Sequence, residues 1–560
     1  MSSQKHIVII GGTACGPKAA VRARRLDPAA RITVIEQIDN LSTATCGLPY
    51  FISGVIKNRE DMVAQDVGYF RDVFDLDVLI RTEAINIDRK SHTVRTIRHA
   101  DGKEAAVEYD NLVIATGAAP IVPDWEGKNL QGIFSLTGLA DADAIRNYVT
   151  QTDTKDISII GAGLIGIEMA ENFMKLGFNV TLIEALDWML PKLLDFEVAA
   201  YTRKHLEDQG INLLFGQRVS GLEGDASGKV RKVILENGEV PAGLVLLSLG
   251  VRPNVNLARD AGLTVGETGG IAVNEKLQTN DPDIYAGGDC VENTHLITGK
   301  KVLVPMGSTA NKHGRVIGTN LTGGNDTFHG VLGTAIVKVF EHNVGRTGLT
   351  ETEAHQAGYE TTTALVPGEE FADYYPGGEQ ILVKLVAEKS TGKLLGVQVV
   401  GPGEAAKRID VIATALTLGC KMEDLANLDL SYAPPYNSAM DPLHHAANII
   451  RNKQAGIART LTPMEVKTKL DNDEEFVLLD VRGEDEWKQE RFDVPQSRLL
   501  PLPELRRRLE ELDRNAEIVI YCHTSVRAYR TQRILEGAGF RNVKFMEGSL
   551  SAWPYDDYLS

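Results

Sequence analysis

The sequence predicts an α/β fold with two Rossmann-like nucleotide-binding units, on the strength of two observations. Hydrophobic strands alternate with helical stretches along the chain, and segments 6–25 and 157–184 each run strand, glycine-rich turn, helix. A glycine-rich turn between a buried strand and a helix is typical of a dinucleotide site, because backbone N–H groups there can approach a pyrophosphate. A length of 560 residues allows roughly three or four domains, so we expect further units.

Composition and charge narrow the class of protein. Hydrophobic residues make up 43% and charged residues 24%, which is ordinary for a globular protein. The net charge of −17 argues against a nucleic acid or an anionic membrane as the main partner. No signal-peptide pattern and no long apolar run occurs, so we expect a cytoplasmic protein. The 5 cysteines are widely spaced, without a CxxC pair or zinc spacing, and we predict no metal site.

The second glycine-rich turn carries the stronger motif. Gly161, Gly163 and Gly166 form a complete GxGxxG after a β-branched strand. Glu184 ends the following strand, roughly 20 residues on, where an acid binds the ribose 2′-hydroxyl. A carboxylate there would repel a 2′-phosphate, so NADH is favoured over NADPH.

The first turn is a weaker match to the same motif. Gly11 and Gly16 hold the outer positions, Thr13 replaces the middle glycine, and Glu36 ends the next strand. Either turn could instead serve close packing and bind no nucleotide, and this alternative is stronger for the first turn.

Three later segments complete a recognisable order of motifs. Segment 109–120 ends in a turn at Thr116 and Gly117, segment 245–254 turns at Gly250, and segment 279–290 reads TNDPDIYAGGDC. This order resembles the flavin-dependent pyridine nucleotide-disulfide reductases over residues 5 to about 450. The resemblance implies FAD and NADH as cofactors, with Asp289 at the ribityl and pyrophosphate region of the flavin.

The resemblance also implies the division of the chain. We expect two nested nucleotide-binding domains, an α+β dimerisation domain, and a further C-terminal α/β domain. The predicted boundaries are FAD domain 1–119 and 252–324, NADH domain 120–251, dimerisation domain 325–450, linker 451–462 and C-terminal domain 463–560.

The segment STATCGLPY (42–50) places a single cysteine, Cys46, close to the expected flavin. Positions 41 and 51 are Leu and Phe, so the CxxxxC pair of two-cysteine reductases is absent. The motif is similar to that of coenzyme A-disulfide reductases and NADH-dependent persulfide reductases, with Ser42 and Cys46 in matching places. A lone thiolate there can attack a disulfide or persulfide. Related oxidases and peroxidases also use one cysteine, and a buried core thiol is the plainer alternative.

A coenzyme A site is expected from two features. Lys18, Arg22 and Arg25 share one helix face, which suits a phosphate-rich ligand, although a solvated basic face is the commoner case. Segments 371–378 and 431–442 resemble the tyrosine-rich coenzyme A pocket that the family builds across its dimer. We expect Tyr375, Tyr432 and Tyr436 there, with Tyr432 or Tyr436 as the acid for the leaving thiolate, or alternatively as interface packing.

The sequence departs from this family pattern at several positions. Thr45 stands where an asparagine is expected and Met440 where a lysine is expected, which weakens the expectation of coenzyme A. His444 and His445 could contact substrate or fill an interface. Cys15 could be a second thiol near Cys46, although packing is the favoured reading.

The C-terminal segment resembles a rhodanese. After the strand that ends at Asp480, the loop C-H-T-S-V-R runs from Cys522 to Arg527 between a strand and a helix. Six residues in this arrangement would hold a cysteine persulfide with backbone N–H groups at a helix N-terminus, and Arg527 would close the cradle. The closing segment MEGSLSAWPY and the LDVR strand end extend the resemblance over about 461–560.

These features together predict an NADH:persulfide or polysulfide reductase that releases sulfide. FAD, NADH and Cys46 would carry out the reduction, and the C-terminal domain would carry or deliver sulfane sulfur on Cys522. The expected enzyme is a homodimer acting on a small-molecule persulfide, polysulfide or coenzyme A disulfide. Alternatives are a coenzyme A-disulfide reductase, an NADH oxidase or peroxidase, and a sulfur carrier or redox sensor.

Overall fold

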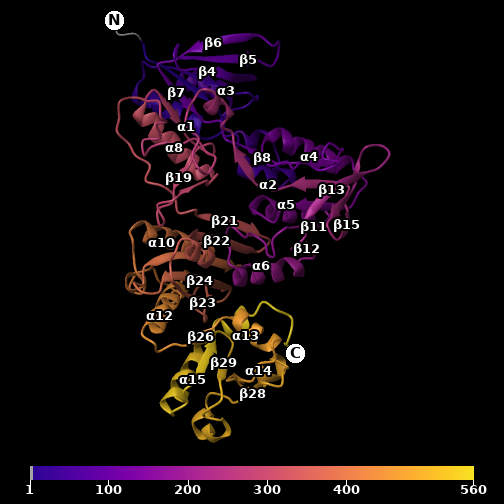
Figure 1. The fold of residues 1–560 in the computed structure, drawn as a ribbon, viewed down its shortest axis with the longest axis vertical. Coiled ribbons are helices and arrows are strands. Elements are labelled where there is room, and N and C mark those ends of the chain that lie inside the picture. Colours follow the sequence, from indigo (N-terminus) through magenta and orange to yellow (C-terminus); the bar gives the residue numbers. More distant parts are fainter. Residues whose placement is uncertain (1–3) are drawn as a thin grey trace. The chain divides into compact units, whose positions relative to one another are not determined.

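The computed structural model describes residues 4–560, which form two compact units (Figure 1). The first unit extends to Ala185 and resumes at Gly216–Val331. The second comprises Leu186–Phe215 and Leu332–Ser560.

A five-stranded parallel sheet in the order β18-β7-β1-β2-β3 organises the first part of the first unit. Its strands are short and rich in isoleucine and valine, which favour the extended backbone and fill a two-sided core. The strands are β1 (His6–Ile10), β2 (Arg31–Ile35), β3 (Asp77–Leu79), β7 (Asn111–Ile114) and β18 (Ile284–Ala286). The antiparallel strands β4 (Thr82–Asp88), β5 (Thr93–Arg98) and β6 (Glu104–Glu108) form a separate three-stranded sheet.

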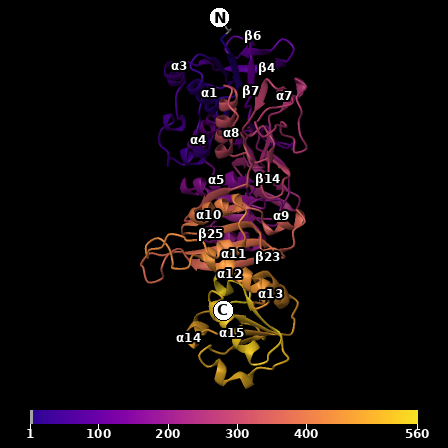
Figure 2. The same cartoon turned by 90° about the vertical axis from the view of Figure 1, so that its left-hand side faces the viewer.

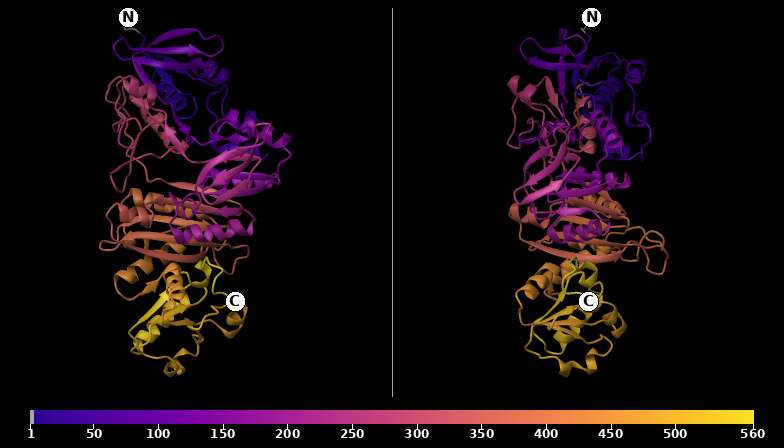
Figure 3. Two further views of the ribbon diagram at one scale, coloured as in Figure 1. Left: turned by 45° about the vertical axis from the view of Figure 1, so that its right-hand side comes forward. Right: turned by 90° about the vertical axis from the view of Figure 1, so that its right-hand side faces the viewer.

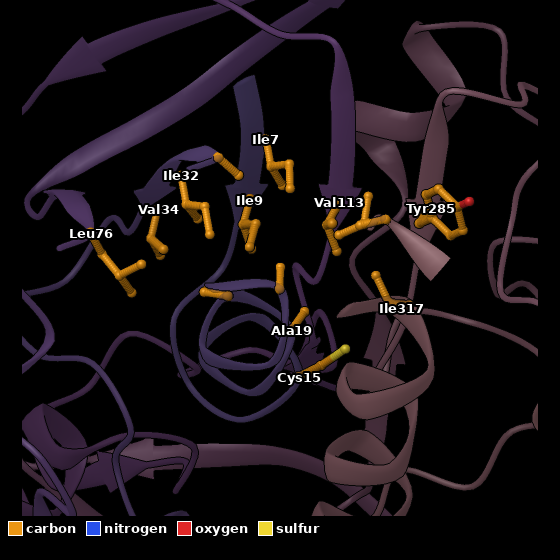
Figure 4. Close-up of a cluster of buried hydrophobic side chains, with 14 of the residues drawn as sticks. Ile7, Ile9, Cys15, Ala19, Ile32, Val34, Leu76, Val113, Tyr285 and Ile317 are labelled. Carbon is orange, nitrogen blue, oxygen red and sulfur yellow. The ribbon is translucent and has the colours of Figure 1, made fainter. Parts of the chain in front are cut away.

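Helices α1 (Cys15–Leu26) and α8 (Gly307–Asn320) lie side by side below this sheet (Figure 4). A Cβ on Gly318 would contact the Ala19 carbonyl oxygen and the Arg22 side chain. The glycine therefore allows α8 to lie close to α1. In the core between helices and sheet, Ile9, Val34 and Ile317 are fully or almost fully buried. This packing fixes the start of α1 against the ends of the strands. Shorter helices in this part are α2 (Leu48–Ile52), α3 (Val67–Phe74) and α7 (Asn256–Asp260).

A second parallel sheet lies in the same unit, with the strand order β11-β10-β16-β9. These strands are β9 (Ile133–Phe134), β10 (Asp156–Ile160), β11 (Asn179–Ile183) and β16 (Leu244–Leu247). The accompanying elements are α4 (Leu139–Gln151), α5 (Leu164–Lys175) and the antiparallel strands β13 (Val219–Gly224), β14 (Val230–Leu235) and β15 (Gly238–Pro241). Strands β8 (Ala118–Pro120) and β17 (Val251–Pro253) pair where the chain crosses between the two sheets. Two-residue strands β19 (Asn293–Thr294) and β20 (Lys301–Val302) pair with each other.

The second unit contains a five-stranded antiparallel sheet in the order β21-β22-β25-β24-β23, whose strands run alongside one another in orange in Figure 3. Strands β24 and β25 are almost entirely buried. The strands are β21 (Ala335–Val339), β22 (His342–Gly348), β23 (Thr361–Glu369), β24 (Gln380–Glu388) and β25 (Leu394–Gly401). Its helices are α9 (Glu351–Gln356), α10 (Ala405–Thr417), α11 (Met422–Leu425) and α12 (Pro442–Gln454), and the segment 186–215 adds α6 (Phe196–Asp208) and β12 (Asn212–Leu214).

The C-terminal part is a five-stranded parallel sheet in the order β26-β30-β29-β27-β28, flanked by α13, α14 and α15 (Figure 2). The central strand β29 (Ile518–Tyr521) is fully buried. The other strands are β26 (Thr460–Leu461), β27 (Val477–Asp480), β28 (Ser497–Leu499) and β30 (Val543–Met546). The helices are α13 (Pro463–Asp471), α14 (Glu484–Gln489) and α15 (Val526–Gly537), followed by the 3-10 turn η5 (Ser549–Ala552).

These architectures confirm the predicted mixed α/β fold with two Rossmann-type units. Part of the expected linker 451–462 has regular structure, because α12 extends to Gln454 and β26 begins at Thr460. Within residues 4–560, no helix is long and apolar enough to cross a membrane. The same residues contain no cluster of three potential metal ligands.

Candidate active site

The first glycine-rich turn is shaped by contacts that exclude side chains. Gly11 has a φ of +107°, and a Cβ there would overlap the carbonyl oxygen of Ala115. A Cβ on Gly16 would overlap the carbonyl oxygen of Gly11 in the same way. The Gly12 N–H donates to Glu36 Oε2 over 2.6 Å, and burial raises the pKa of this carboxyl. The turn is therefore a tight backbone cradle beside an acid, as a dinucleotide site requires.

The second turn repeats this arrangement on the other sheet of the unit. Gly161 has a φ of +106°, and a Cβ there would overlap the carbonyl oxygen of Ser248. Gly166 packs against Gly161 as Gly16 packs against Gly11, and Gly163 caps α5. The Ala162 N–H donates to Glu184 Oε2 over 3.0 Å. Both predicted acids thus lie at the turns that the sequence assigned to them.

The Glu184 carboxylate should set the preference for NADH. Replacing it by serine removes the negative charge, so we expect kcat/KM for NADPH to rise at least tenfold relative to NADH. Steady-state rates with each nucleotide would measure this change. Glu236→Ser, an exposed acid of the same unit, is the control. An unchanged ratio in Glu184→Ser would show that the carboxylate does not face the ribose.

The predicted segments 109–120 and 245–254 are hydrogen-bonded to each other. The Thr116 hydroxyl donates to the Asn254 carbonyl oxygen over 2.7 Å, and Asn254 Nδ2 donates to the Thr116 carbonyl oxygen over 2.9 Å. Gly117 and Gly250 have φ values of +66° and +90°. Asn254 did not stand out in the sequence, although it ends the same VRPN turn.

Asp289 follows a turn that only small residues can form. The Gly288 N–H donates to His313 Nδ1 over 3.1 Å, and a Cβ on Gly287 would contact Cys15 Sγ. Burial raises the pKa of the Asp289 carboxyl. Cys15 is 4% exposed, and burial raises the pKa of its thiol well above the ordinary value, so it is a packed core residue (Figure 4).

Cys46 lies in an exposed 3-10 turn, η1 (Thr45–Gly47), directly before α2. The Ser42 N–H donates to the Gly12 carbonyl oxygen over 2.7 Å, which ties this segment to the first glycine-rich turn. The Ala64 N–H donates to the Ser42 carbonyl oxygen over 3.0 Å and holds the other side of the segment. The thiol is accessible while the backbone on its N-terminal side is fixed.

Glu168 is a residue of this site that the sequence did not single out. The Tyr50 hydroxyl, four residues after Cys46, donates to Glu168 Oε1 over 3.3 Å. Burial raises the pKa of Glu168 to about 7, and burial followed by the Glu168 charge raises the pKa of Tyr50 to about 12. Glu168 belongs to α5, two residues after Gly166, so this hydrogen bond joins the cysteine segment to the second glycine-rich turn.

The stability of the protein should depend on the ionisation of Glu168. Its pKa is about 7 in the folded state and near the ordinary 4.5 when unfolded, so the folded state binds more protons between these values. The contribution of Glu168 to the stability of the folded state is fully present below the lower pKa and is lost as the pH rises through about 7. From pH 5 to 8 we expect the native protein to lose up to about 3 kcal/mol relative to Glu168→Gln. Urea unfolding at several pH values measures this difference, and parallel curves would contradict it.

The three predicted cations of α1 have different neighbours. Lys18 is exposed, the Arg22 Nε donates to the Thr319 hydroxyl on α8 over 3.1 Å, and the Arg25 guanidinium lies 5.6 Å from the Phe74 ring centroid. They share a helix, but Arg22 and Arg25 already have partners within the chain. A phosphate ligand at this face stays a prediction.

The two tyrosine-rich segments lie together in the second unit. The Tyr374 and Tyr432 hydroxyls are 3.1 Å apart, while the Tyr375 ring packs against Phe371. Tyr436 is 71% exposed, and its carbonyl oxygen accepts from Lys407 Nζ over 2.8 Å. Tyr374, which was not among the predicted residues, is thus the partner of Tyr432.

A buried arginine forms hydrogen bonds at both tyrosine segments. Arg408 on α10 is 1% exposed, and its Nη2 donates to the Glu370 carbonyl oxygen over 2.6 Å and to Asn437 Oδ1 over 3.3 Å. Its Nε donates to Asp441 Oδ2 over 3.1 Å. Segment 371–378 begins directly after Glu370, and Asn437 and Asp441 belong to segment 431–442, so Arg408 links the two segments.

His444 and His445 have separate positions. His444 Nδ1 accepts from the Asp441 N–H over 3.2 Å, and Nε2 lies 2.9 Å from the Leu428 carbonyl oxygen. These contacts make His444 part of the N-terminal cap of α12. His445 is exposed on the same helix.

The predicted sulfur-carrying loop lies between β29 and α15. Cys522 is fully buried, and Ser525, which has a φ of +79°, caps α15. Arg527 interacts electrostatically with Cys522 and forms a two-pronged ion pair with Glu486, with both N···O distances 2.7 Å. The Arg527 hydrogen bonds lower the pKa of Glu486 to about 2.

The buried acid Glu547 joins the C-terminal sheet to the antiparallel sheet of the same unit. Glu547 is 2% exposed, and its Oε2 accepts from the Leu365 N–H of β23 over 2.9 Å. Its Oε1 accepts from the Thr460 hydroxyl over 2.5 Å and from Lys453 Nζ of α12. Ser549, two residues further on, contacts Cys522, so the anchor lies close to the sulfur-carrying loop.

Comparison with known proteins assigns three stretches of the chain to known families. The sequence matches the family described as pyridine nucleotide-disulphide oxidoreductase over residues 5–314. The chain belongs to the pyridine nucleotide-disulphide oxidoreductases. Residues 334–444 match the dimerisation domain of this family, and residues 462–555 match the rhodanese-like domain.

Individual members of the family resemble the chain over most or all of its length. An NAD(P)H sulfur oxidoreductase (CoA-dependent) of Pyrococcus furiosus is 40% identical over 448 residues, covering 80% of this chain and 99% of the relative. The structure of an NAD-dependent persulfide reductase from A. fulgidus has a TM-score of 0.93 and 42% identity, covering 98% of this chain and 100% of that chain. Reduced Bacillus anthracis CoADR-RHD matches with a TM-score of 0.93, 35% identity and 98% coverage of both chains.

Proposed function

We propose that this oxidoreductase uses NADH to reduce persulfide or polysulfide sulfur to sulfide. Cys46 acts as the nucleophile, and the rhodanese-like domain carries sulfane sulfur on Cys522. The observation that carries this proposal is the presence of an exposed, unpaired Cys46 beside the first glycine-rich turn on a chain that also holds Cys522 beside Arg527. The names of the P. furiosus and A. fulgidus relatives support the same substrate class.

The two glycine-rich turns fit FAD and NADH respectively. Gly11, Gly16 and Glu36 would hold the dinucleotide part of FAD, with Thr116, Gly117 and Asp289 nearby in the fold. Gly161, Gly163, Gly166 and Glu184 would hold NADH. When bound, FAD supplies the transfer of two electrons from the nicotinamide to sulfur.

The sulfur chemistry requires one accessible thiolate and one proton donor. Cys46 attacks the outer sulfur of a persulfide R–S–SH, the S–S bond breaks, and R–S⁻ leaves and takes up a proton. Two electrons from NADH then release that sulfur from Cys46 as sulfide and restore the thiolate. Overall, one NADH, one proton and one persulfide give NAD⁺, one thiol and one hydrogen sulfide.

Coenzyme A and the dimer complete the proposal. Tyr375, Tyr432 and Tyr436 would form part of a coenzyme A site with Lys18, Arg22 and Arg25, and Tyr432 or Tyr436 would protonate the leaving thiolate. The match to the dimerisation domain supports a homodimer in which the tyrosines of one subunit serve the cysteine of the other. The cytoplasmic location stays a prediction.

An anaerobic comparison of substrates tests the proposed function. NADH oxidation and sulfide release would be followed with glutathione persulfide, coenzyme A persulfide, polysulfide and coenzyme A disulfide. We expect one sulfide per NADH and a higher kcat/KM for persulfides than for the disulfide. A preference for coenzyme A disulfide would assign the chain to disulfide reduction, and NADH use that needs oxygen would assign it to the oxidases.

A further inference from the structure

A short turn outside the C-H-T-S-V-R loop contributes to the Cys522 site. The Cys522 N–H donates to Ser549 Oγ over 3.1 Å, and the Leu550 N–H donates to the Cys522 carbonyl oxygen over 3.3 Å. The Ser551 N–H donates to the His523 carbonyl oxygen over 3.0 Å. Three successive residues of η5 are therefore hydrogen-bonded to the two residues that begin the loop.

The Ser549 hydroxyl lies against the sulfur as well as the backbone. Its Oγ is 3.9 Å from Cys522 Sγ, and both residues are fully buried. The same hydroxyl is 3.2 Å from the Met546 carbonyl oxygen, so its single proton can be donated either to this oxygen or to the Cys522 sulfur. A neutral thiol accepts weakly, whereas a thiolate or persulfide anion attracts the proton strongly.

The backbone at Ser549 is held in an unusual conformation. Ser549 has a φ of +51°, a left-handed conformation that costs energy for a residue with a Cβ. A glycine would adopt it more easily, so a serine here carries a conformational cost that a glycine would avoid. The hydroxyl contacts described above give a reason for its presence.

We propose that Ser549 is a member of the sulfur-carrying site, whose hydroxyl turns from the Met546 carbonyl to the Cys522 sulfur when that sulfur is anionic. This inference rests on the proposed function. In the transfer step, the Cys522 thiolate attacks the outer sulfur of R–S–SH, the S–S bond breaks, and R–S⁻ leaves while Cys522–S–SH forms. Ser549 stabilises the anion before the attack and again when the persulfide ionises.

Other charged groups near Cys522 have defined places. Arg527 on α15 interacts electrostatically with Cys522, and Glu486 on α14 pairs with Arg527. Asp480 ends β27 and forms a buried ion pair with Arg482. His523 and Tyr521 are chain neighbours, and the Glu547 carboxylate bonds to Thr460 and Leu365. Ser549 adds a neutral donor to these charged groups.

The test is persulfide loading of Cys522 in the full-length protein without NADH. Glutathione persulfide would be added at pH 5–9, and Cys522–S–SH would be trapped by alkylation and quantified by peptide mass. In both Ser549→Ala and Ser549→Gly we expect loading at pH 7 to slow about tenfold. The midpoint of the pH profile should move upward, which a purely structural defect would not cause. Thr531→Val, on α15 outside the loop, removes a buried hydroxyl without a partner among the described residues and should load within twofold of the native protein.

Each contrary outcome has a defined meaning. Native-like loading in both Ser549 variants overturns the proposal, and slowing in the alanine variant alone assigns the effect to the backbone and overturns it too. Failure of the native protein to load Cys522 also overturns it. The proposed reductase function fails separately, if Cys522 loads normally but the native protein does not oxidise NADH with persulfide.

Discussion

Replacing Cys46 by serine should reduce persulfide-dependent NADH oxidation by on the order of 10³-fold or more, because a serine hydroxyl is a far weaker nucleophile toward sulfur. Cys46 is exposed, and its neighbour Ser42 is bonded to the first glycine-rich turn. Within residues 4–560, this unit has no other exposed thiol, because Cys15 and Cys290 are buried in its core. Anaerobic sulfide release with glutathione persulfide measures the effect.

Two further variants make this result specific. Cys420→Ser changes a partly buried thiol of the second unit and should retain nearly native rates. Cys522→Ser should retain reduction of small persulfides while losing any dependence on sulfur loaded onto the rhodanese-like domain. If Cys46→Ser keeps more than a tenth of the native rate, Cys46 is not the nucleophile.

Replacing Arg408 by methionine should destabilise the second unit by about 3–5 kcal/mol, the usual cost of leaving a buried charge without its partner. Asp441 is 1% exposed and would lose its ion pair, and the Glu370 carbonyl oxygen would lose a buried donor. The tyrosine segments held by these contacts should become mobile. Urea unfolding measures the stability, and hydrogen exchange of residues 371–378 reports the loss of order.

Asp410→Ala is the matched control for this variant. Asp410 belongs to the same helix but is exposed, so its removal should change stability by less than about 0.5 kcal/mol. Equal effects of the two variants would mean that Arg408 contributes only to helix formation. A stable Arg408→Met protein with native exchange at 371–378 would contradict the assignment.

The glycine-rich turns could be predicted from sequence because their requirement is local. Gly16 and Gly166 each face the carbonyl oxygen of the glycine that begins the same turn, and the spacing of the motif encodes this exclusion directly. The acids that end the following strands are placed by the same short-range geometry. The loop from Cys522 to Arg527 was predictable for the same reason.

The missed residues depend on contacts between distant segments. Tyr50 and Glu168 are 118 residues apart in the sequence, and Tyr374 and Tyr432 are 58 apart. Ser549 contacts Cys522 from beyond the far end of the next strand, and Asn254 pairs with Thr116 although 138 residues separate them. No periodicity or spacing encodes such pairs, because the three-dimensional fold brings them together.

The Glu547 anchor has a consequence for how the second unit opens. Its carboxylate receives the Leu365 amide of β23, Lys453 of α12 and the Thr460 hydroxyl, so separating the rhodanese-like sheet would strand a buried charge. The two sheets should therefore lose protection against solvent deuterium as one cooperative body. The Leu365 amide, although it lies in the antiparallel sheet, would report the opening of the sulfur-carrying domain.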